Sequence, residues 1–224
     1  MRLRERPDAA AHGTAEVLVA TLPRLSELYG RTVVVVAGDH VLGDDKLRHA
    51  FCGDIAFLRY SGVRAVIVHD HGPHPPVSPP DDPVALRRYV AGYVQRRLVG
   101  SLGDHTVPAV GITGEDARTL VVGDGTDVQA DPGVVRLFLG TGHIPVVSSV
   151  AYDSGGGIRF LGAVTAAVAL ADALQAALVL PAGAEGTCDA AASVVDMSVP
   201  HAVLRHLHRL DGEGESGPGA VSGG

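Results

Sequence analysis

Two short apolar runs limit what this chain can fold into more than any other feature of its sequence. The runs are "RTVVVVAG" at residues 31–38 and "VRAVIVHDHG" at residues 63–72, and neither alternates apolar with polar positions. Such strands are typical of a parallel sheet that helices cover on both faces. Segments with apolar residues at helical spacing separate these and later strands. The pattern therefore predicts an α/β fold with a mainly parallel, open sheet.

Composition excludes several classes of partner. The 224 residues are 46% hydrophobic, which is sufficient for a large core, and the formal net charge of −7 disfavours nucleic acid as a partner. No apolar run reaches membrane-spanning length, and the first residues lack the apolar stretch of a signal peptide. Cys52 and Cys188 lie far apart, as expected of reduced thiols. We expect a cytoplasmic protein without a membrane or nucleic-acid partner.

The chain divides into three parts by composition. Residues 1–13 form an N-terminal extension, residues 14–210 form a single domain, and residues 211–224 are a glycine-rich, acidic tail that we expect to be disordered. No internal repeat is present in the sequence.

Polar side chains follow the first two predicted strands, in the loops 38–43 and 69–76. Because ligands of parallel sheets bind at the carboxyl ends of the strands, these loops predict a site. Histidine titrates near neutrality and is suited to acid–base catalysis with a carboxylate. The candidate catalytic residues are Asp39, His40, His69, Asp70 and His71, and a buried pair of His40 with Asp70 is one arrangement they allow.

The same histidines allow a metal site. His69 and His71 are two residues apart, so on an extended segment both side chains point the same way. With His40 or His74 added, the set would suit a divalent transition metal such as zinc, iron or copper. The alternative is that His71 and His74 are exposed loop residues beside prolines.

Several segments resemble a known family in order and spacing. "YGRTVVVVAGDHVL", "DIAFLRYSGVRAVIVHDHGP", "AVGITGEDARTL", "GHIPVVSS" and "GAVTAAVALADALQAALVL" are similar to the acetylglutamate kinase branch of the amino-acid kinase family. The resemblance implies a three-layer αβα sandwich, phosphorylation of a carboxylate with ATP and magnesium, and a homodimer, here through the segment 83–101. It also implies ligand-binding roles for Gly38, Gly72, Thr113 and Gly114.

The resemblance breaks down at the catalytic positions. Val36 stands where the family has a lysine, and the family's glycines are replaced by side chains that include Asp39 and Asp70. Lys46 is the single lysine of the chain. Because phosphoryl transfer depends on positioning and on neutralisation of charge, we expect these acids to oppose it. The sequence therefore predicts that ATP and magnesium are not used.

Three functions remain open at this point. The first is a protein that binds an acidic or acylated amino acid, as a regulatory paralogue or as a partner subunit. The second is a repurposed enzyme that uses the His/Asp cluster, with or without a metal, on a substrate derived from an amino acid. The third is an acetylglutamate kinase that retains its activity.

Overall fold

Six strands form one parallel sheet. The structure, a computed structural model, describes residues 19, 22–23, 25–75, 82–123, 127–184 and 192–206. The strand order is β10-β9-β1-β2-β6-β3, and every neighbouring pair is parallel. The strands are β1 (Thr32–Val36), β2 (Arg64–His69), β3 (Ala109–Thr113), β6 (Ile144–Ser148), β9 (Ala177–Pro181) and β10 (Ala192–Val195). The predicted parallel sheet is confirmed.

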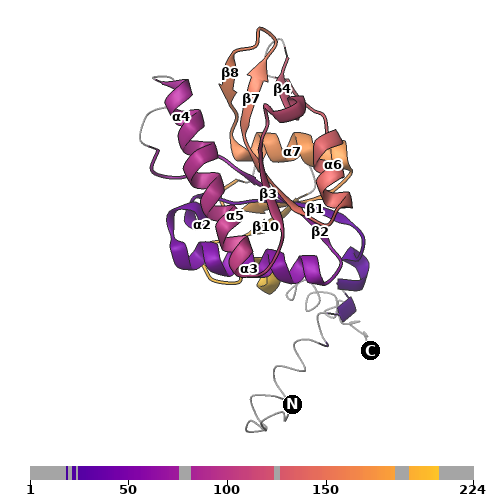
Figure 1. Ribbon diagram of the computed structural model, residues 1–224. Coiled ribbons are helices and arrows are strands. Elements are labelled where there is room, and N and C mark those ends of the chain that lie inside the picture. Colours follow the sequence, from indigo (N-terminus) through magenta and orange to yellow (C-terminus); the bar gives the residue numbers. More distant parts are fainter. Residues whose placement is uncertain are drawn as a thin grey trace, which may run out of the picture.

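Helices cover both faces of this sheet, as Figure 1 shows. One face carries α3 (Asp45–Tyr60) and α5 (Gln95–Asp104), and the other carries α6 (Gly133–Gly140) and α7 (Ala163–Leu174). Alternate residues of β1 enter the two cores: Val33 and Val35 lie in the core of α3 and α5, and Val34 lies in that of α7. A strand buried on both faces needs no polar positions, which explains the uninterrupted apolar run. The three-layer αβα architecture is confirmed.

One short helix connects β1 to the helical layer. The helix α2 (Asp39–Gly43) follows β1 directly, and Asp44 then begins α3. The Asp44 carboxylate accepts hydrogen bonds from the backbone N–H groups of Lys46 (2.8 Å) and Leu47 (2.9 Å). These two bonds satisfy donors that the helix itself leaves unpaired, so Asp44 is the N-cap of α3.

The helix expected at 83–101 is not continuous. It consists of α4 (Pro83–Tyr89), a π-helical turn η1 (Val90–Val94) and α5. Directly after the turn, the buried Gln95 amide donates to the carbonyls of Ile112 (2.6 Å) and Val146 (2.9 Å), on β3 and β6. These bonds attach α5 to the edge of the sheet. A homodimer through this segment stays a prediction.

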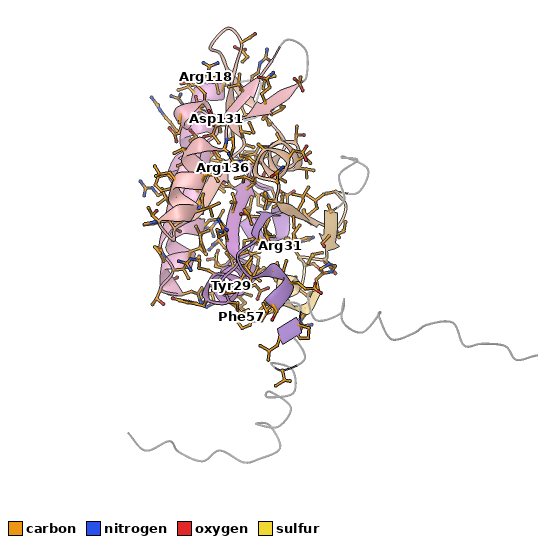
Figure 2. The ribbon with its side chains drawn as sticks, turned by 90° about the vertical axis from the view of Figure 1, so that its right-hand side faces the viewer. Tyr29, Arg31, Phe57, Arg118, Asp131 and Arg136 are labelled. Carbon is orange, nitrogen blue, oxygen red and sulfur yellow. The ribbon has the colours of Figure 1, made fainter. Side chains whose placement is uncertain are left out.

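A second, smaller sheet has the order β5-β4-β7-β8. The apolar segment "IPVVSSV", which the sequence alone suggests is one strand, is divided between the two sheets, because β6 ends at Ser148 and β7 begins at Val150. The small sheet lies above the main sheet in Figure 1, and Figure 2 shows Arg118 and Asp131 at the opposite end of the molecule from Tyr29 and Phe57. Its strands are β4 (Leu120–Val122), β5 (Val128–Ala130), β7 (Val150–Asp153) and β8 (Ile158–Phe160), preceded by the 3₁₀ turn η2 (Asp116–Arg118).

The predicted extension 1–13 and tail 211–224 lie outside the described residues. Among the helices that the structure describes, none is both long and apolar enough to cross a membrane.

The junction of the two sheets gives a test of the packing. A Cβ atom at Gly114 would lie 2.4 Å from the Val150 carbonyl oxygen and 2.7 Å from a Leu120 methyl group. We expect Gly114→Ala to lower the free energy of unfolding by roughly 1–3 kcal/mol. Gly100→Ala is the matched control, because nothing lies within 4 Å of its Cβ position in α5; it should raise stability by about 0.5–1 kcal/mol. Urea unfolding measures both, and a neutral Gly114→Ala would contradict the described junction.

Candidate functional site

A cavity opens at the carboxyl edge of the main sheet, where the strand order reverses. From β1 the chain continues to β2 on one side and returns later to β9 on the other, which makes this edge a topological switch point. The cavity has a volume of about 490 Å³, and we call it the β1/β9 cavity. Its lining comes from the ends of β1 and β9, the start of α7 and Met197: residues 36–40, Asp70, residues 162–165 and residues 181–184.

The backbone supplies one wall of the β1/β9 cavity. Gly38 permits close packing there, since a Cβ atom would lie 2.9 Å from the ring of Pro181. Gly162 caps the start of α7 without a side-chain hydrogen bond, and the first bond inside this helix runs from Ala166 N–H to the Gly162 carbonyl. The preceding N–H groups of α7 therefore have no partner within the helix. Such a helix start favours an anionic ligand.

Acidic side chains line the same cavity. Asp39 and His40 are exposed and Asp70 is half-buried. The Asp70 carboxylate also accepts a hydrogen bond from Gly72 N–H (3.0 Å), which holds the loop after β2 in a tight turn. The sequence-predicted candidates Gly38, Asp39, His40 and Asp70 thus lie together. Because His40 is exposed, these residues do not make the buried His40–Asp70 pair that the sequence also allowed.

His69 lies inside the protein instead of in the cavity. Its side chain is completely buried, and Nδ1 lies 2.9 Å from the Asp70 carbonyl oxygen, so the neutral ring donates from Nδ1. Burial lowers the pKa of His69 to about 4. Nε2 is a buried acceptor without a partner among the described groups, and so is the Ser148 hydroxyl of the neighbouring strand. His69 has the environment of a core histidine.

His71 and His74 face a different cavity, and so does Gly72. We call it the arginine cavity, because Arg48 and Arg97 line it. The four histidines of the predicted metal site are therefore divided among two cavities and the core. Within the described residues there is no group of three or more His, Cys, Asp or Glu side chains that could hold a metal ion. The expectation of a transition-metal centre is corrected accordingly.

Thr113 and Gly114 lie at a third location. Thr113 lines a cavity with Arg87, Arg88 and Arg96, while Gly114 packs against Val150 and Leu120. The Asp116 carboxylate accepts a hydrogen bond from Thr113 N–H (2.7 Å), so the "TGED" segment is a self-capped turn. The ligand-binding roles predicted for Thr113 and Gly114 stay predictions.

Sequence reasoning missed two kinds of site residue. It did not select the α7 segment Gly162–Thr165, although a glycine before an apolar helix is a visible signal of an uncapped start. It also missed Arg48 and Arg97. Arg48 lies three residues after Asp45, a spacing that predicts an ion pair on a helix, whereas Arg97 reaches the same carboxylate from 52 residues away in the chain.

The fold and the cavity together define a class of protein. A parallel sheet with a ligand cavity at its switch point and a helix start facing that cavity is the arrangement of α/β proteins that bind anionic small molecules. Residues 31–186 match the model of the amino acid kinase family, and the chain belongs to that family.

Curated relatives agree with this assignment. The chain is 38% identical over 200 residues to the acetylglutamate kinase of Mycobacterium sp. (strain JLS), a match that covers 75% of this chain and 69% of the relative. It is 37% identical over 203 residues to the acetylglutamate kinase of Acidothermus cellulolyticus, with the same coverage. The match to the Frankia casuarinae acetylglutamate kinase, at 36% identity, spans 76% of this chain and 57% of that protein.

Solved structures support the fold. N-acetylglutamate synthase from Neisseria gonorrhoeae, complexed with coenzyme A and N-acetyl-glutamate, superposes with a TM-score of 0.60 at 21% identity. The match covers 89% of this chain and 56% of the synthase chain. Isopentenyl phosphate kinase superposes with a TM-score of 0.55 at 16% identity, over 80% of this chain and 97% of that chain.

These relatives overturn one expectation from the sequence. The prediction that ATP and magnesium are not used is wrong: the chain is 36–39% identical to proteins named acetylglutamate kinase, and nothing in the comparison indicates a loss of kinase activity. The physical error lies in counting side-chain charges alone. A bound cation is the largest local charge in a phosphate site, and carboxylates that repel a bare phosphate attract that cation.

The buried His69 gives a pH-dependent prediction. Its pKa of about 4 in the folded protein lies below the value of about 6.5 expected in the unfolded chain, so the unfolded state binds more protons between these values. The contribution of neutral His69 to the free energy of unfolding is present above pH 6.5, and it is lost as the pH falls from 6.5 towards 4. Between pH 7 and pH 5 the loss should be about 2 kcal/mol.

Urea unfolding at the two pH values measures the effect. His69→Gln should remove most of this difference, because glutamine does not titrate, whereas His49→Gln at an exposed position of α3 should leave it in place. An unchanged pH dependence in His69→Gln would contradict the buried, neutral imidazole.

Proposed function

We propose that this chain phosphorylates a carboxylate of an N-acylated acidic amino acid, with N-acetylglutamate as the first substrate to test. The observation that carries the proposal is the 36–39% identity to acetylglutamate kinases. The family match over residues 31–186 includes the lining of the β1/β9 cavity except Met197. The chain spans 57–69% of the length of these relatives, so the activity of the whole relative is a hypothesis for this chain.

The β1/β9 cavity provides groups for the phosphates. The N–H groups of Ala163, Val164 and Thr165 at the start of α7 can donate to phosphate oxygens. The Gly38 backbone also lines this cavity, where it packs against Pro181. Backbone donors of this kind are fixed before the ligand arrives, so they stabilise charge without reorganisation.

The acidic residues of the cavity fit magnesium. Asp39 and Asp70 present carboxylate oxygens, and Mg²⁺ is usually held by one or two carboxylates together with substrate phosphates and water. When bound, magnesium neutralises charge on the phosphates that are being transferred. In this proposal Asp39 and Asp70 orient the cation, and the start of α7 orients the phosphate chain.

A second candidate function rests on Val36. This residue is buried, lines the cavity and stands where the resembled family has a lysine. No lysine or arginine is among the described residues that line the cavity. A regulatory paralogue or partner subunit would bind the same acylated amino acid, and turnover would then belong to its partner. The repurposed enzyme that would use the His/Asp cluster loses its main support, because His40, His69 and His71 do not lie in one site.

The assay of ADP formation tests the first proposal. Purified protein with ATP, Mg²⁺ and N-acetylglutamate should form ADP only when the acylated amino acid is present. Asp39→Asn should raise the Mg²⁺ concentration needed for half-maximal rate and lower kcat roughly ten- to hundredfold. Asp172→Asn, an exposed carboxylate near the far end of α7, is the matched control and should leave both values unchanged.

Calorimetry with N-acetylglutamate separates the two candidates. Saturable binding together with ADP formation supports the kinase, and saturable binding without ADP formation at any Mg²⁺ concentration supports the paralogue. A protein that neither binds N-acetylglutamate nor forms ADP would contradict both.

A further inference from the structure

The arginine cavity shares no lining residue with the β1/β9 cavity. It lies where α2 ends, between α3 and the segment that contains η1, and its volume is about 450 Å³. The lining combines cationic, histidine and tyrosine side chains: Leu42, Gly43, Arg48, residues 71–74, Tyr89, Tyr93, Val94 and Arg97.

Arg48 carries an unsatisfied donor at this cavity. Its side chain is 8% exposed, and two of its nitrogen atoms are paired: Nη2 donates to Asp45 Oδ1 (2.9 Å) and Nε donates to Ser101 Oγ (3.3 Å). The third nitrogen, Nη1, is buried without a partner among the described groups. An unpaired buried donor of a charged group is costly, so Nη1 is a position at which an acceptor atom would be stabilised.

The charges around Arg48 favour an anion. Arg97 also forms an ion pair with Asp45, and its guanidinium lies 5.2 Å from the centroid of the Tyr93 ring. Asp45 is shared by two arginines and is 75% exposed. Hydrogen bonding and charge from Arg48, with a smaller contribution from Arg97, hold the pKa of Asp45 below its usual range. Two guanidinium groups against one carboxylate leave a positive charge at this cavity.

Two tyrosine side chains and the loop after β2 form the remaining walls of the arginine cavity. Tyr89 and Tyr93 stack with their ring centroids 5.3 Å apart, and the Tyr89 hydroxyl donates to the His74 carbonyl (3.2 Å). This bond connects the loop after β2 to the helical segment on the other side of the cavity. The two arginines therefore line a hollow with walls on both sides, and the burial of Arg48 strengthens a charge-assisted hydrogen bond there.

We infer that the arginine cavity is a binding site for the oxyanion of a small molecule, a carboxylate or a phosphate, with Arg48 Nη1 and the Arg97 guanidinium as donors. The site is additional to the β1/β9 cavity and does not depend on the reaction proposed there. Guanidinium groups match the geometry of both oxyanions, and the two sources are distinguished by the probe that binds.

Isothermal titration calorimetry with inorganic phosphate and, separately, with glutarate tests the site in the full chain. At least one of the two probes should show saturable binding, and the number of probe molecules bound per chain should include one at this site. Arg97→Gln should weaken that binding about tenfold or more, since a charge-assisted hydrogen bond and a positive charge are removed. Arg48→Lys keeps the charge but lacks Nη1, and it should weaken binding to a similar extent.

Arg96→Gln is the matched control, because Arg96 lines the cavity of Arg87 and Thr113 and is the neighbour of Arg97 in the chain. It should bind the probe like the unaltered protein. Glutarate binding alone assigns a carboxylate ligand, and phosphate binding alone assigns a phosphoryl ligand. Absence of saturable binding of both probes, or equal binding by the unaltered protein, Arg97→Gln and Arg48→Lys, would overturn the inference.

Discussion

The parallel pairing of β1 with both β2 and β9 determines where every candidate functional group lies. Val36 pairs with Val68 and Val35 pairs with Val179, so the three strands end at one edge of the sheet. The side chains of this central region are buried on both faces, and a shift of register by one residue would exchange the faces. The β1/β9 cavity, the loop after β2 and the short helix α2 all depend on this pairing.

Most of the fold could be predicted from the sequence, because apolar runs without alternation and helices of regular spacing are signals that do not depend on distant contacts. The division of "IPVVSSV" between two sheets could not be predicted. Ser148 and Val150 are both buried, so burial does not mark the break, which arises where β7 turns to pair with β4 and β8. The π-helical turn before Gln95 likewise depends on carbonyls of β3 and β6 that lie far away in the chain.

The candidate site was predicted less well, for a geometric reason. The sequence correctly placed Asp39, His40 and Asp70 at the carboxyl edge of the sheet. The strand β2 ends at His69, and the loop turns directly after it, with Gly72 N–H donating to the Asp70 carboxylate, so His69 and His71 do not share a direction as they would on a strand. His69 stays in the core while His71 and His74 reach another cavity. The alternation of side chains applies only to extended backbone, and it fails here because the strand ends at His69.

Val36 has a consequence for how a phosphate can be neutralised here. A lysine at this position would bring a positive charge to the β1/β9 cavity, which Val36 lines, and valine leaves the cavity without that charge. The described cavity then supplies partial positive charge from the start of α7 and negative charge from Asp39 and Asp70. In the proposed function two carboxylates raise the affinity for a divalent cation, so neutralisation of the phosphate would come from an ion that arrives with the ligand instead of from a resident side chain. Such a site should depend more steeply on the concentration of magnesium than one that holds its own lysine, and this dependence separates an altered phosphate site from one that no longer binds phosphate.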